Sequence, residues 1–164
     1  MLRTLRSLTI LSALACLAAC PPSAAQVQAA RTTHYAGPAP DLVALAEQAA
    51  IDQQYQIADE RREDGAFMTA GKWYGAEGDV RTQGAGGAKV EDGAILLELV
   101  VRFVGTTDDA TVEILPVMQR YASGRSNLDK IPPGDPRQPP WVQGKVDALY
   151  VAIHDALAGH VTAH

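Results

Sequence analysis

The sequence predicts an α+β domain: a four-stranded antiparallel meander sheet with two helices packed on one face, in the order α-β-β-β-β-α. Apolar residues recur at helical spacing near both ends of residues 41–158, and runs that alternate apolar and polar residues lie between them. Short turn signals join these runs. Short hairpin connections favour antiparallel pairing, with helices covering the apolar face of the sheet.

The first helix is predicted to begin after Asp41, whose side chain is a good N-cap, and to end near Gln53. Its moderately apolar face is made by residues at helical spacing: Leu42, Leu45, Ala46 and Ala49. We expect this face to pack on the sheet.

Two strands are predicted at residues 55–60 and 65–74, which alternate in part. The charged stretch between them ends in Asp64-Gly65, a hairpin signal. Residues 75–93 are glycine-rich and charged, and they predict either a long exposed loop or a flexible extension of two strands. This pair therefore forms the first half of the meander.

The clearest strand spans residues 94–104, and the next spans 111–118 after a turn at 105–109. On the first of these, Ile95, Leu97, Leu99, Val101 and Phe103 point one way. Pro116 cannot donate a ladder hydrogen bond, so its strand is expected at a sheet edge or near its own end.

The closing helix is predicted at residues 141–158, after an irregular crossing at 123–140 that holds five prolines and two glycines. One stripe of the helix is apolar at spacings of three and four: Val142, Val146, Leu149, Ile153 and Leu157. The domain thus ends as it begins, with a helix that covers the sheet.

The first twenty residues predict export. Arg3 and Arg6 precede an apolar run at 8–17 that is too short to span a bilayer, which takes roughly 20 residues. Leu17-Ala18-Ala19-Cys20 resembles the bacterial lipobox. The resemblance implies a signal peptide at 1–19, diacylglycerol on the Cys20 thiol and acylation of the new amino terminus. Two or more acyl chains anchor a protein stably.

The remaining boundaries follow from this site. We expect a lipidated Cys20 and flexible tether at 20–40, a single domain at 41–158 and a solvated tail at 159–164. The alternative is cleavage after Ser23-Ala24-Ala25, which would release a soluble periplasmic protein. With the anchor, the protein faces the periplasm, and we favour the outer membrane over the inner.

Composition limits the classes of partner and site. The whole chain has a net charge of −5, and the predicted mature chain keeps 12 basic side chains against 19 acidic ones. An acidic surface argues against nucleic acid or anionic lipid headgroups as main partners. Cys16 and Cys20 lie before or at the cleavage point, so no disulfide or thiolate metal site is expected within one mature chain.

Several polar clusters resemble sites, but each is better explained as solvated surface. His154, His160 and His164 include a helical spacing that suits a metal, but no glutamate lies between the last two as in a metalloprotease. The glycine run at 84–89 matches no phosphate-binding spacing, and the acidic residues at 59–64 and 108–109 lie in predicted turns. We predict no catalytic residues, no metal and no cofactor.

Trp73, Tyr74 and Trp141 are the most informative aromatic residues in an aromatic-poor chain. They are candidates for a partner interface, because tryptophan and tyrosine dominate binding energy at interfaces. Packing of the strand residues against the last helix is the alternative. Both interpretations remain open from the sequence.

The pattern from residue 49 to 73 ends an alanine-rich helix, continues through Tyr-x-Ile and a charged hairpin, and closes with Gly-x-Phe-x-Thr-x-x-x-Trp. With the meander and closing helix, it resembles small BamC-like envelope lipoproteins of helix-grip topology. The resemblance implies a non-catalytic module that binds another envelope protein. Docking on the exposed sheet face or strand addition near 112–118 is the expected mode. A carrier of a small ligand or lipid in an apolar groove between sheet and final helix is the alternative, as is a weak metal binder.

Overall fold

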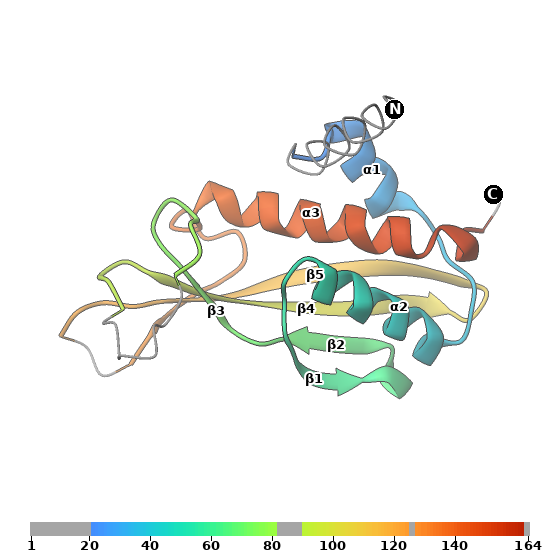
Figure 1. Cartoon of the computed structure of the whole chain (residues 1–164), viewed down its shortest axis with the longest axis horizontal. Coiled ribbons are helices and arrows are strands. Elements are labelled where there is room, and N and C mark those ends of the chain that lie inside the picture. Colours follow the sequence, from blue (N-terminus) through green and yellow to red (C-terminus); the bar gives the residue numbers. More distant parts are fainter. Residues whose placement is uncertain (1–20, 82–89, 125–126, 163–164) are drawn as a thin grey trace, which may run out of the picture.

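A computed structural model describes residues 21–81, 90–124 and 127–162, and it confirms the α+β class (Figure 1). The described residues form three α-helices and an open six-stranded antiparallel sheet. The helices are α1 (Ala24–Thr32), α2 (Ala39–Asp52) and α3 (Pro140–Ala156). The strands are β1 (Ile57–Arg61), β2 (Ala66–Thr69), β3 (Lys72–Tyr74), β4 (Ile95–Thr106), β5 (Asp109–Arg120) and β6 (Asp129–Ile131). None of the described helices is long and apolar enough to cross a membrane.

The core lies between one face of the sheet and the helices α2 and α3. Alternate β4 residues are buried, as predicted: Ile95, Leu97, Leu99 and Val101. The predicted stripe of α3 is also buried, from Val142 to Leu157. Both helices lie on the same side of the sheet in Figure 1 and contact each other along it. The apolar side chains of the strands and the helices therefore form one core.

The sheet has six strands in the described residues instead of the predicted four, and one cause is a step in the second predicted strand. The buried hydroxyl of Thr69 accepts a hydrogen bond from the N–H of Leu99 (2.9 Å), where a backbone carbonyl would otherwise pair. The chain then shifts, so β2 and β3 pair with successive stretches of β4. At the step, a Cβ on Gly71 would lie 2.8 Å from Leu96, so glycine permits the close approach.

The other additional strand is β6, inside the predicted irregular crossing. Its three residues pair with the end of β5, with Ile131 opposite Met118. A run this short has no alternation to detect, and prolines follow it directly. The crossing prediction was therefore wrong for residues 129–131.

Pro116 lies on β5 in the way its missing N–H requires. The register places Leu99 opposite Pro116, and the N–H of Leu99 points away from β5 toward Thr69. Opposite residues in an antiparallel pair either exchange both hydrogen bonds or neither. The Pro116 nitrogen thus faces the outer edge of β5, before β6 begins to pair, as the sequence predicted.

Residues 21–40 do not form the flexible tether that we expected. Ser23 and Gln26 form a reciprocal capping box at the start of α1. We did not use this signal in the sequence, because the alanine-rich composition of the segment is typical of a linker. Helix α1 packs on α3, where Arg31 pairs with Asp147 (2.7 Å) and its guanidinium lies 4.8 Å from the centre of the Tyr150 ring. The N-terminal segment is therefore part of the fold.

The segment after α1 is also fixed, together with the predicted tail. Tyr35 is fully buried and bridges Ala110 on one side and Val161 on the other. Helix α2 then begins at Ala39, with Pro38 as its N-cap residue, so Asp41 lies in the first turn instead of capping the helix. The folded unit consequently extends beyond the predicted 41–158 at both ends.

Candidate functional site

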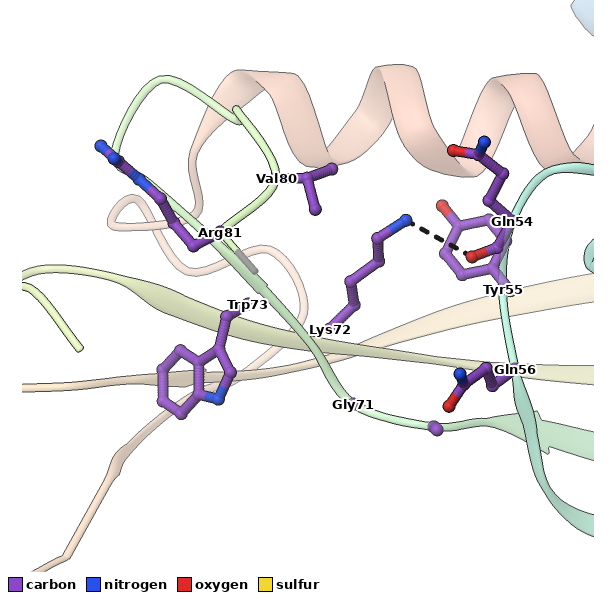
Figure 2. A pocket seen from close by; sticks show the side chains of 9 residues that line it. Gln54, Tyr55, Gln56, Gly71, Lys72, Trp73, Val80 and Arg81 are labelled. Carbon is purple, nitrogen blue, oxygen red and sulfur yellow. Dashed lines mark hydrogen bonds between the residues drawn. The ribbon is translucent and has the colours of Figure 1, made fainter. Parts of the chain in front are cut away.

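A pocket of about 490 Å³ opens between the end of α2, the step before β3 and the chain at residues 80–81 (Figure 2). A smaller cavity of about 240 Å³ continues from it beneath α3. The two share Gln54, Tyr55, Lys72 and Val80 as lining residues. We call the combined space the Lys72 pocket.

One wall of the Lys72 pocket is built by the end of α2. Gln54 adopts the left-handed backbone conformation (φ 64°) that usually requires glycine. Its N–H donates to the carbonyl of Ile51 (2.8 Å), and the N–H of Tyr55 donates to that of Ala50 (3.0 Å). These two bonds terminate the helix and direct the buried Tyr55 ring toward β3.

The opposite wall is built by β3, whose alternation separates its side chains. Figure 2 shows Lys72 extending toward Gln54 and Tyr55, while Trp73 lies on the other side of the strand. The Lys72 ammonium group donates to the carbonyl of Gln54 (3.4 Å) and lies 5.6 Å from the centre of the Tyr55 ring. Lys72 is therefore held across the pocket.

A second lysine reaches the same space from α3. The ammonium groups of Lys145 and Lys72 lie 5.4 Å and 6.0 Å from the centre of the buried Tyr74 ring. Burial lowers the pKa of Lys72, and the positive charge of Lys145 lowers it further. The site thus brings two ammonium groups, one from β3 and one from α3, close to the same aromatic ring.

The phenols of the site are neutral. Burial raises the pKa of Tyr55 and, less strongly, that of Tyr74. The neighbouring Tyr74 phenol raises the pKa of Tyr55 further. Neither group therefore supplies a negative charge to the lysines at neutral pH.

No carboxylate lines the Lys72 pocket, among the residues that the structure describes. Neither Lys72 nor Lys145 forms an ion pair within that part of the chain. Arg81, at the mouth, is already paired with Asp79 (2.9 Å) and Glu91 (3.0 Å). The pocket is consequently a local concentration of positive charge on an acidic protein.

The predicted interface residues divide between core and surface. Tyr74 is buried, and the half-buried Trp141 packs on it with ring centres 5.0 Å apart. The Trp141 Nε1–H donates to the carbonyl of Ala76 (2.9 Å), and Gly78 lies so close that a Cβ would be 2.6 Å from the indole. Trp73 is half-buried on the other side of β3 and does not join this pair.

The other sequence candidates lie elsewhere. The lipobox Leu17-Ala18-Ala19-Cys20, the glycine run at 84–89 and His164 fall outside the described residues. His154 Nδ1 lies 3.0 Å from the Tyr35 hydroxyl, and His160 Nδ1 lies 3.0 Å from the carbonyl oxygen of Ala36. Over residues 21–81, 90–124 and 127–162, no group of three histidine, cysteine or acidic side chains is arranged to hold a metal.

Sequence reasoning missed Lys72 and Lys145. They belong to a strand and a helix that are far apart in the chain, and only the fold brings them to one ring. Comparison with known proteins adds no name to the site: neither a family model nor a curated protein sequence matches this chain.

Proposed function

We propose that this chain is a lipid-anchored, periplasm-facing binding protein of the bacterial envelope that is non-catalytic and uses the Lys72 pocket as its binding site. The pocket carries the proposal: it is open to solvent, it joins three elements, and its two lysines have no carboxylate partner among the described residues. Cys20 would carry the lipid, and the outer membrane is the favoured location.

The anchor and the fold are compatible. Only Pro21 and Pro22 separate Cys20 from Ser23, which caps α1. Three extended residues reach about 10 Å. A lipid on Cys20 would therefore hold the domain against the membrane surface instead of at the end of a long tether.

Docking in the pocket is better supported than strand addition at β5, because the outer edge of β5 is occupied at several places. Ala110 exchanges backbone hydrogen bonds with Tyr35, and the Ile114 N–H donates to the Tyr150 hydroxyl of α3 (3.0 Å). Pro116 has no N–H, and β6 pairs from Met118 onward. Features of this kind protect sheet edges from adding another strand.

The structure also bears on the alternative function, a carrier of a small ligand or lipid in an apolar groove. A cavity does lie between a strand and the C-terminal helix, which favours a ligand site of the helix-grip kind. However, six of its nine lining residues are lysine, glutamine or tyrosine, beside Val80, Ala148 and Leu149, so a polar anionic ligand suits it better than an acyl chain. The cavity beneath the C-terminal helix also leads us to propose a helix-grip-like arrangement of sheet and helices. Another envelope protein remains the proposed partner of the domain.

The anchor is tested by labelling growing bacteria with radioactive palmitate. We expect the wild-type protein to incorporate label and to fractionate with membranes. Cys20→Ser should remove the label, because no other cysteine follows residue 20. Cys16→Ser is the matched control and should retain the label. An unlabelled wild-type protein that begins at Gln26 would contradict the anchor.

A further inference from the structure

We propose that Lys72 and Lys145 bind a phosphate group, supplied by an anionic phospholipid headgroup of the membrane that holds the protein. The inference rests on the proposed envelope location and specifies the ligand of the Lys72 pocket. Its basis is the convergence of two ammonium groups on the Tyr74 ring at 6.0 Å and 5.4 Å, with no lining carboxylate among the described residues.

The two lysines differ from the arginines of the described chain, most of which have acidic partners. Arg31, Arg61, Arg62, Arg81, Arg102 and Arg137 each form an ion pair. Lys72 and Lys145 instead both lie near the Tyr74 ring, and the positive charge of Lys145 lowers the pKa of Lys72, because like charges repel. A bound anion would remove this repulsion.

The donors that remain free fit a phosphate. An ammonium group has three N–H donors, and Lys72 uses one of them on the carbonyl of Gln54. The bond to Gln54 and the Tyr55 ring hold Lys72 in place, which reduces the entropy lost on binding. A phosphate offers several oxygens to two cations on different walls, and lysine binds phosphate as a point charge.

The groove beyond Lys145 leads toward the anchor. Lys145, Ala148 and Gln53 line both the inner cavity and a larger groove of about 930 Å³, whose other walls include Pro21 and Pro22. Those prolines follow Cys20 directly. A lipid on Cys20 therefore places the bilayer, with its phosphate groups, at the open end of the groove that contains Lys145.

The acidic residues of that outer groove do not neutralise the lysine pair. Asp155 lies ten residues further along α3 than Lys145, about 15 Å along the helix axis. Glu77 belongs to the turn that packs around Trp141, and no ion pair links it to Lys145 in the described part of the chain.

The experiment is a calorimetric titration of the processed full-length protein, purified in neutral detergent. The probes are short-chain phosphatidylglycerol, short-chain phosphatidylcholine and inorganic phosphate. We expect phosphatidylglycerol to bind, and Lys72→Gln or Lys145→Gln to weaken it about tenfold, the usual effect of losing one charged hydrogen bond. Lys130→Gln removes an exposed lysine on β6 and should leave the affinity unchanged.

The arms of the titration distinguish the sources of phosphate. Inorganic phosphate that binds as tightly as the lipid, with the same dependence on both lysines, would support the phosphate site and overturn the lipid source. Equal binding of phosphatidylcholine, no binding at all, or binding that survives both substitutions would overturn the proposal. Thermal melts of each variant check that the fold is intact.

Proton linkage gives a second readout. The pKa of Lys72 lies below its usual 10.5, and a bound anion favours the charged form. The affinity should therefore fall as the pH rises through this lowered pKa, and the fall should disappear in Lys72→Gln. The titration tests the phosphate site at Lys72 and Lys145, and palmitate labelling tests the lipid anchor at Cys20. Failure of one proposal can therefore be distinguished from failure of the other.

Discussion

Glu47 on α2 is only 3% exposed, and Arg62 compensates the charge of its buried carboxylate. The Arg62 Nε donates to Glu47 Oε2 (2.8 Å), while Oε1 is buried with no partner in the described residues. A carboxylate in this position is costly unless a cation compensates it. The pair joins the helix to the turn between β1 and β2, so it also aligns the charged hairpin.

Arg62→Ala should lower the free energy of unfolding several-fold more than Arg61→Ala does, because it leaves the Glu47 carboxylate buried and unpaired. The Arg62 side chain is itself 46% exposed, so the loss comes from Glu47. Urea denaturation of both proteins measures the change.

Arg61→Ala is the matched control. The Arg61 side chain pairs with Asp59 at the surface and is 65% exposed, so its loss should change stability by less than about 0.5 kcal/mol. Equal effects of the two substitutions would show that the burial of Glu47 has no role.

At the scale of elements, the end of α2 links stability with the pocket. Gln54 occupies a left-handed position, which costs a non-glycine residue roughly 1–2 kcal/mol. Its carbonyl nevertheless orients Lys72, and its side chain lines the pocket. A strained residue at a lining position is consistent with a functional constraint.

Gln54→Gly should raise the free energy of unfolding by about 0.5–1 kcal/mol, because the relief of strain exceeds the added flexibility of glycine. Gln53→Gly, one residue earlier at an ordinary backbone angle (φ −83°), should lower it by a similar amount. Thermal and urea unfolding measure the change in the free energy of unfolding for both variants. A loss of stability in Gln54→Gly would show that the backbone at Gln54 is not strained.

Long elements were predictable from the sequence, and short or non-local features were not. The β4–β5 hairpin and α3 follow from periodicity over a dozen residues or more. The step at Thr69 depends on a side-chain bond to Leu99, thirty residues away in sequence. No local pattern contains that information, so β2 and β3 were predicted as one strand.

The site was predictable only in its aromatic part. Tyr74 and Trp141 stood out because aromatic residues are rare in this chain, and the structure brings them into contact. Lys72 and Lys145 carried no such signal, because single lysines on a strand and a helix are ordinary surface residues. Their proximity is a property of the packing of α3 beside β3.

For the whole molecule, the main revision concerns residues 21–40, which are folded onto the domain. Figure 1 shows α1 beside α3, with the following segment running past the end of α3 to α2. Tyr35 is buried in that segment, and Thr162 donates its N–H to the carbonyl of His34 (3.0 Å). The residues once expected to give reach are folded onto the domain, so the proposed anchor leaves it little freedom.

We propose that a lipid on Cys20 holds this domain and its lysine groove against the bilayer. Neutron reflectometry of the lipidated protein on a supported bilayer measures the gap between headgroups and domain. The structure predicts a gap of about 10 Å or less, the reach of residues 20–23. A free tether of residues 20–40 would give roughly 25 Å. A hydrated gap of that size would contradict the proposed position of the domain against the bilayer.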